Sequence, residues 1–164
     1  MEIAVRSFDN KPDRYRYALE QTEAVLSGET DETAGLANAS AVLNLLLPRI
    51  NWVGFYLLRG GQLVLGPFQG KPAVSRIAPG DGVCGTAVQS GQDQLVPDVH
   101  ACCNHIACDL ASASEVVLII RVKGNLYALL DIDSPVTNHF DEEDLAGLRP
   151  VANAIGRWIA RIGE

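Results

Sequence analysis

The order of the periodic segments is what most constrains the fold of this chain. Strand-like segments come as hairpin pairs in the middle of the chain, whereas most helical patterns lie near its two ends. The predicted helices cover residues 12–26, 30–47, 85–89 and 141–162, and the predicted strands cover residues 52–58, 62–68, 95–96, 115–122 and 126–133. This order predicts an α+β fold with a central, mainly antiparallel β-sheet and helices packed on it, rather than a parallel βαβ fold.

Local signals mark the ends of two of these helices. Asn10 can cap the first helix, and Gly28 is a stop signal after it. Asp141, with Asp144 three residues later, opens the last helix. Because Pro150 lies inside the same pattern, we expect a kink or a break there.

Length, charge and hydropathy exclude several classes of protein. A chain of 164 residues suits one domain, which we expect to span residues 1–164. A formal net charge of −7 argues against nucleic acid or an anionic membrane as a partner. The longest apolar run, residues 116–120, is far too short for a membrane span, and the N-terminus has no signal-peptide pattern. Cysteines without an export signal indicate a reducing compartment, so we expect a cytoplasmic protein.

Residues 82–109 contain all four cysteines of the chain and two of its three histidines. The cysteines are Cys84, Cys102, Cys103 and Cys108. This concentration favours thiol chemistry. Residues 97–114 have no clear period and are long for a structureless loop, which is typical of lids and binding loops. The spacing C-C-x-H-x-x-C of residues 102–108 matches no common zinc pattern, so we expect no metal site.

Cys84 lies between Gly82 and Gly85, close to the expected start of a short helix. A helix N-terminus lowers the pKa of a thiol, which would make Cys84 reactive. The alternative interpretation is a small buried residue at a crowded turn. The sequence leaves both interpretations open.

Acidic residues cluster at the ends of two predicted strands. Asp131 and Asp133 share one face of an otherwise apolar strand. A three-residue loop over residues 123–125 would set Glu115 opposite Asp133, on the same face. A two-residue turn at Gly124 and Asn125 would put Glu115 on the opposite face. The three carboxylates together would suit a site that binds an ammonium group or holds a protonated acid.

Two aromatic side chains share a face of the first predicted strand. Strand periodicity puts Trp52 and Tyr56 on one face, on either side of a notch at Gly54. The simplest interpretation is a core face with two aromatic rings whose polar tips are satisfied. The alternative is the wall of a binding pocket.

Five segments occur in order along the chain: NWVGFY (51–56), GVCGTA (82–87), HIACD (105–109), SE (114–115) and LDIDS (130–134). Together they resemble the free methionine-(R)-sulfoxide reductases, a family of GAF domain enzymes. The resemblance implies a GAF-like fold, with the N- and C-terminal helices on one face of the sheet and a shorter helix and loops over a ligand pocket on the other. It also implies a homodimer and a thioredoxin-type dithiol reductant, with no metal or organic cofactor.

The resemblance also implies roles for individual residues. Cys108 matches the catalytic cysteine, whose thiolate attacks the sulfoxide sulfur and becomes a sulfenic acid. The matching carboxylates polarise the sulfoxide oxygen and hold the substrate's ammonium group, and the matching aromatic residues line the wall beside the substrate's methyl group and sulfur. The carboxylates are Glu115, Asp131 and Asp133, and the aromatic residues are Trp52 and Tyr56.

One departure from the family concerns recycling of the sulfenic acid. The family usually has a resolving cysteine ten residues before the cysteine of GVCGTA, and this chain has Val74 there. Cys84 is our preferred resolving residue, and Cys102, Cys103 or an external thiol are alternatives. Val74 also leaves open a non-catalytic GAF module that senses a small molecule. A redox- or metal-sensing loop built on the cysteines of residues 102–108 is a further alternative.

Overall fold

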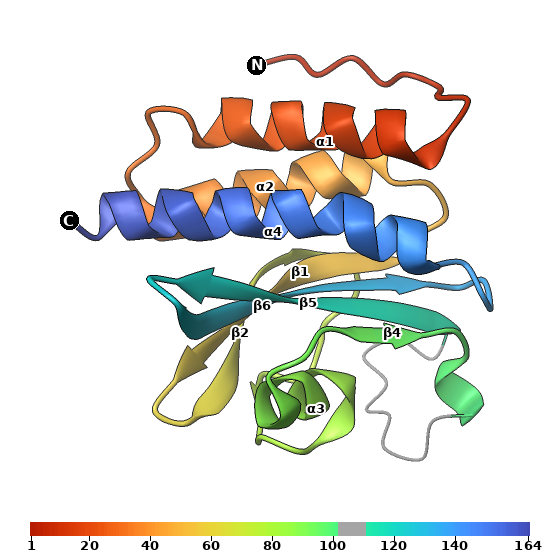
Figure 1. Ribbon diagram of the computed structural model, residues 1–164, viewed down its shortest axis with the longest axis vertical. Helices are drawn as coiled ribbons and strands as arrows, with labels where there is room; N and C mark the ends of the chain where they lie inside the picture. Colours follow the sequence, from red (N-terminus) through yellow and green to blue (C-terminus); the bar gives the residue numbers. More distant parts are fainter. Residues whose placement is uncertain (102–110) are drawn as a thin grey trace.

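The computed structural model describes residues 1–101 and 111–164, and its elements form stacked layers (Figure 1). A six-stranded sheet has the order β3-β2-β1-β6-β5-β4, and all neighbouring strands are antiparallel. Its strands are β1 (Trp52–Arg59), β2 (Gln62–Gln69), β3 (Arg76–Ile77), β4 (Gln94–Val96), β5 (Ser114–Val122) and β6 (Asn125–Ser134). This confirms the predicted α+β fold.

The helices cover the two faces of the sheet unequally. The long helices are α1 (Lys11–Leu26), α2 (Glu32–Leu46) and α4 (Glu142–Ile162), and the short helix is α3 (Gly82–Ser90). Helices α2 and α4 pack on one face of the sheet, and α1 lies over both of them (Figure 1). Helix α3 lies on the other face. None of the described helices is both long and apolar enough to cross a membrane.

Capping residues begin the long helices close to the predicted positions. The Asn10 side chain accepts a hydrogen bond from the Asp13 backbone N–H at 2.9 Å. Asp141 and Asp144 form a capping box, in which each side chain accepts a hydrogen bond from the other residue's backbone N–H. The last helix continues through Pro150, so the break that the sequence allowed does not occur. Helix α3 begins at Gly82, three residues before the predicted start.

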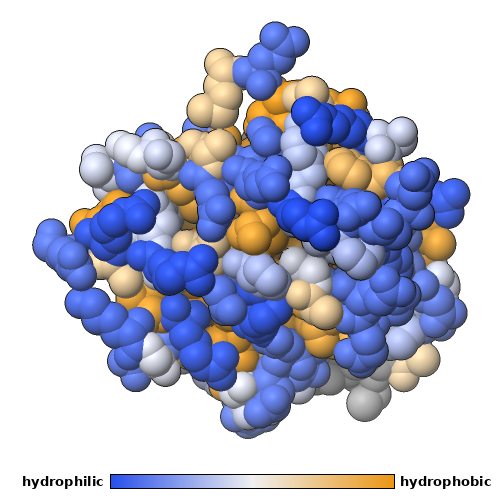
Figure 2. Space-filling model, turned by 45° about the horizontal axis from the view of Figure 1, so that its top comes forward, coloured by the Kyte–Doolittle hydropathy of each residue, from blue (hydrophilic) through white to orange (hydrophobic). Residues whose placement is uncertain are grey.

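The central strands β1, β5 and β6 alternate their side chains between two hydrophobic clusters. The cluster under α2 and α4 includes Val53, Phe55, Val116, Leu118 and Leu130. The cluster on the α3 side includes Trp52, Tyr56, Val117, Ile119 and Leu129. Because both faces are covered, the central strands are apolar nearly throughout. Figure 2 shows that the surface viewed there is mainly hydrophilic, with small hydrophobic areas between the polar side chains.

The turn between β5 and β6 decides which side chains face α3. Lys123 and Gly124 both have positive φ (52° and 83°), as in a two-residue hairpin turn. A register shift between Ile120 and Arg121 then adds one residue on β6 and brings Glu115 opposite Asp133. The observed register is therefore the same-face one of the two that the sequence left open, although a tight turn and a bulge produce it instead of a three-residue loop.

Gly156 allows α4 to approach β5 closely, and this contact gives a stability prediction. A Cβ at Gly156 would lie 2.3 Å from the Arg121 carbonyl oxygen. We expect Gly156→Ala to lower the free energy of unfolding by about 1–3 kcal/mol, because crowding against backbone outweighs the better helix propensity of alanine. Urea denaturation measures the change. Gly163→Ala is the control, because the nearest atom to its Cβ would be the Ile159 carbonyl oxygen, at 3.5 Å. Equal effects of the two substitutions would contradict the predicted contact.

Candidate active site

Three buried carboxyl groups lie on the sheet face that α3 covers. Asp131 pairs with Gly54 across the β1–β6 ladder, and Asp133 pairs with Trp52. Glu115 pairs with Asp133 across the β5–β6 ladder, so all three carboxyl groups share one face. Their exposed fractions are 5% for Glu115, 2% for Asp131 and 3% for Asp133. Such burial of acidic groups is costly unless they are protonated or paired, which marks this face as a candidate site.

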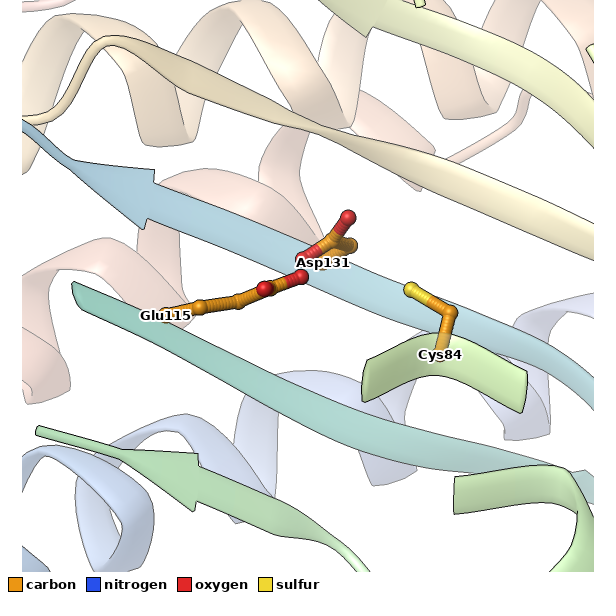
Figure 3. Close-up of side chains that lie close together, drawn as sticks. All are labelled: Cys84, Glu115 and Asp131. Carbon is orange, nitrogen blue, oxygen red and sulfur yellow. The ribbon is translucent and has the colours of Figure 1, made fainter. Parts of the chain in front are cut away.

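Cys84 joins this group from the first turn of α3. Figure 3 shows the Cys84 sulfur directed from α3 toward Asp131, with the Glu115 side chain reaching across from β5. The sulfur atom of Cys84, one carboxylate oxygen of Glu115 and one of Asp131 all lie within 4.8 Å of one another. The structure therefore brings together a thiol and two acids from three separate elements.

Burial controls the protonation of the Asp131 carboxyl group. Desolvation raises the pKa of Asp131 above its ordinary value, although hydrogen bonds with Glu115 and Cys84 lower it in part. Two carboxyl groups can share a hydrogen bond only if one of them carries a proton. Among the residues that the structure describes, Oδ1 of Asp131 has no hydrogen-bond partner. Asp131 therefore offers a proton-carrying or cation-binding group to the space beside it.

The pKa of the Cys84 thiol is shifted in the direction opposite to that expected of a reactive cysteine. Burial raises the pKa of Cys84 well above its ordinary value, and the charges of Asp131, Glu115 and Asp133 raise it further. Although Cys84 lies in the first turn of α3, these effects outweigh the helix N-terminus. The alternative of a buried residue at a crowded turn describes this thiol better.

Aromatic rings line the same face beside the carboxyl groups. Trp52 stacks on Phe68 with ring centroids 5.2 Å apart, and its centroid lies 6.1 Å from that of Tyr56. The Tyr56 hydroxyl donates a hydrogen bond to the Val74 carbonyl at 2.8 Å, which holds the backbone at residue 74 close to the site. A Cβ at Gly54 would lie 2.3 Å from the Phe68 Cβ, so the absence of a side chain at Gly54, the predicted notch, leaves the room that Phe68 occupies.

Phe68 is a residue of this site that the sequence does not predict. Phe68 pairs with Gly54 across the β1–β2 ladder, past a register irregularity between Gly54 and Tyr56. Its place beside Trp52 depends on that irregularity, for which the sequence gives no clear signal. The remaining predicted residues, Cys102, Cys103 and Cys108, lie outside the described residues.

Comparison with known proteins identifies the class to which this fold and site belong. The sequence profile of the GAF domain family matches residues 21–159. The chain is 49% identical to free methionine-R-sulfoxide reductase from Escherichia coli over 92% of each chain. It is 51% identical to Protein YtsP from Bacillus subtilis, covering 97% of this chain and 98% of that protein. The X-ray structure of free methionine-R-sulfoxide reductase from Neisseria meningitidis in complex with its substrate superposes with a TM-score of 0.91 at 40% identity, covering 98% of this chain and 99% of that one. The chain thus belongs to the GAF domain family and, within it, to the free methionine-R-sulfoxide reductases.

The raised pKa of Asp131 predicts how stability depends on pH. Below the ordinary pKa of 3.8, the folded and unfolded states both hold the Asp131 proton. As the pH rises, the unfolded state releases this proton first, so the Asp131 contribution to stability is lost between 3.8 and the higher folded pKa. We therefore expect Asp131→Asn to raise the free energy of unfolding relative to the wild type, more at pH 8 than at pH 4.

Chemical denaturation at several pH values measures this difference. Asp9→Asn, at an exposed position near the N-terminus, is the matched control and should change stability little at any pH. A stability difference for Asp131→Asn that does not change with pH would contradict the raised pKa.

Proposed function

We propose that this chain reduces free methionine-(R)-sulfoxide to methionine by thiol chemistry. The observation that carries the proposal is the group of three buried carboxyl residues on one sheet face, beside stacked aromatic rings and a thiol. The enzymatic relatives named above support the same activity. We also propose that residues 1–164 act as one catalytic GAF domain, although the family profile itself covers residues 21–159.

The substrate is a zwitterion with one polar sulfoxide group, and the sheet face that α3 covers offers matching chemistry. We assign the substrate's ammonium group to the carboxylates, because an ammonium ion offsets the cost of burying several negative charges. Trp52 and Tyr56 provide apolar surface for the methyl group and sulfur. A methionine within a peptide has no free ammonium group, so this binding mode favours the free amino acid.

Cys108 is the proposed nucleophile, and its assignment rests on the HIACD motif. Its thiolate attacks the substrate sulfur, and the bond between that sulfur and its oxygen breaks. The oxygen and a proton pass to the Cys108 sulfur, which becomes a sulfenic acid, and methionine leaves with its sulfur reduced by two electrons as the transient bond between the two sulfur atoms breaks. A carboxyl group that keeps its proton can donate a hydrogen bond to the sulfoxide oxygen during attack. Asp131 suits this role, because its raised pKa preserves the proton to higher pH.

The sulfenic acid is next attacked by a second thiol, which forms a disulfide and releases water. The family resemblance implies a resolving cysteine at position 74, where this chain has Val74. The raised pKa of Cys84 weighs against Cys84, because the thiolate is the attacking form. We therefore favour Cys102, Cys103 or an external thiol. A thioredoxin-type dithiol then reduces the disulfide, without a metal or organic cofactor.

The cytoplasm is the proposed location, because thiols stay reduced there. A homodimer through the terminal helices also stays a prediction. Trp158, a large apolar residue of α4, is 2% exposed and donates a hydrogen bond to the Glu29 carbonyl. It therefore contributes to the core of its own chain, and Ile162 is the more accessible apolar residue.

The proposed activity predicts epimer-specific turnover that depends on Cys108. Purified protein with a dithiol should produce methionine from the R epimer of free methionine sulfoxide and not from the S epimer. Cys108→Ser should lower the rate by at least about a thousandfold, because removing a nucleophile abolishes the covalent path. Chromatographic quantification of methionine measures both. A wild-type protein as inert as Cys108→Ser, but able to bind a small ligand, would instead support the non-catalytic sensor.

The recycling step predicts which cysteine is oxidised after one turnover. Reduced protein mixed with one equivalent of substrate, without dithiol, should form one methionine per chain. Peptide mass spectrometry should then locate a disulfide between Cys108 and Cys102 or Cys103, or a sulfenic acid on Cys108. We expect Cys84 to remain a thiol, and Cys84→Ser to give the same oxidised peptides. A disulfide between Cys84 and Cys108 would restore Cys84 as the resolving residue.

A further inference from the structure

The group formed by Cys84, Glu115 and Asp131 also has the composition of a metal site. One sulfur and carboxylate oxygens lie within 4.8 Å of one another, and all three residues are buried (Figure 3). The donors come from α3, β5 and β6, so the fold holds each of them from a separate element. Mixed sulfur and carboxylate donors suit Zn²⁺, and softer ions such as Cd²⁺, whereas Mg²⁺ and Ca²⁺ prefer oxygen alone.

A second observation points to a ligand at this position. Asp131 is only 2% exposed, and its Oδ1 has no hydrogen-bond partner within residues 1–101 and 111–164. A buried carboxylate oxygen without a donor is costly, and a bound cation removes that cost. Asp133, on the same face, adds further negative charge close to the group.

We propose that Cys84, Glu115 and Asp131 bind a thiophilic divalent cation, Zn²⁺ or Cd²⁺, and that the bound ion inhibits the enzyme. Three protein ligands leave a fourth tetrahedral position for water. Binding releases two protons to solvent, the thiol proton of Cys84 and the proton that Glu115 and Asp131 share, and bonds form between the metal and the sulfur and carboxylate oxygens. The bound ion takes the carboxylates that we assigned to the substrate's ammonium group. The proposal that these residues bind a metal ion is independent of the proposed function, whereas the proposal that the ion inhibits the enzyme rests on it.

Cadmium binding to a protein with a single thiol tests the site. In the variant Cys102→Ser, Cys103→Ser, Cys108→Ser, Cys84 is the only cysteine left. Titration with Cd²⁺ should produce an ultraviolet thiolate-to-metal charge-transfer band that saturates at one ion per chain. Zn²⁺ should abolish the band by competition, and excess Mg²⁺ should not.

Matched substitutions in the same background separate this site from adventitious binding. Cys84→Ser should remove the band, and Asp131→Asn should weaken cadmium binding by at least about tenfold, which is the scale of losing one contributor to a metal site. Glu142→Gln, at an exposed acidic residue, should leave binding unchanged. Circular dichroism checks that each variant is folded. A folded background variant without a saturable band, or a band that survives Asp131→Asn unchanged, would overturn the site.

Single-turnover measurements test the inhibition separately. Reduced wild-type protein should form less methionine with one equivalent of Zn²⁺ added, and a higher substrate concentration should restore the yield. No dithiol is present to remove the metal. The relative loss should be smaller in Cys84→Ser, compared with its own yield without zinc. Metal binding without any loss of methionine would refute inhibition and leave the site, whereas no methionine even without zinc would count against the proposed function alone.

Discussion

The pairing of β5 with β6 fixes the position of the acidic groups on which the candidate site depends. A tight turn at Lys123 and Gly124, followed by one bulge, sets Glu115 opposite Asp133. Strand side chains alternate between faces, so a shift of one residue would turn Glu115 toward α2 and α4. The same shift would bring Val116 and Leu118 out of the larger hydrophobic cluster. The packing of the helices therefore enforces the register that the site requires.

One face of the sheet mainly stabilises the fold, and the other holds the candidate site. The face under α2 and α4 is packed with aliphatic and aromatic side chains, and its burial provides most of the hydrophobic stabilisation. The opposite face holds three buried acids near Cys84, and desolvation of Asp131 lowers stability near neutral pH because it disfavours the charged form of that carboxyl group. Local destabilisation of this kind is typical of functional sites. A cationic group, whether an ammonium or a metal ion, would relieve it.

Much of the fold follows from signals that act locally. Asn10 and Asp141 cap helices where the sequence predicts them, because capping needs only a side-chain oxygen and nearby backbone N–H groups. The hairpin pattern predicts the antiparallel sheet, and the family motifs predict that Glu115 and Asp131 share a pocket.

Other features depend on contacts that the sequence does not encode locally. Phe68 reaches Trp52 only because the β1–β2 register shifts near Gly54. The pKa of Cys84 depends on how deeply α3 is buried and on acids from two distant strands, so proximity to a helix N-terminus predicts the wrong direction. Helix α4 also continues unbroken through Pro150, which the local propensity of proline does not predict.

Asp131 holds a proton more tightly than an ordinary aspartate, in a site that it shares with Glu115 and Cys84. Carbon-13 NMR of the Asp131 carboxyl carbon, followed through a pH titration, measures this directly. Because the groups interact, Glu115→Gln separates the Asp131 midpoint from that of its neighbour. The structure predicts a midpoint above 3.8 in the substrate-free protein. A midpoint at or below that value would contradict the account.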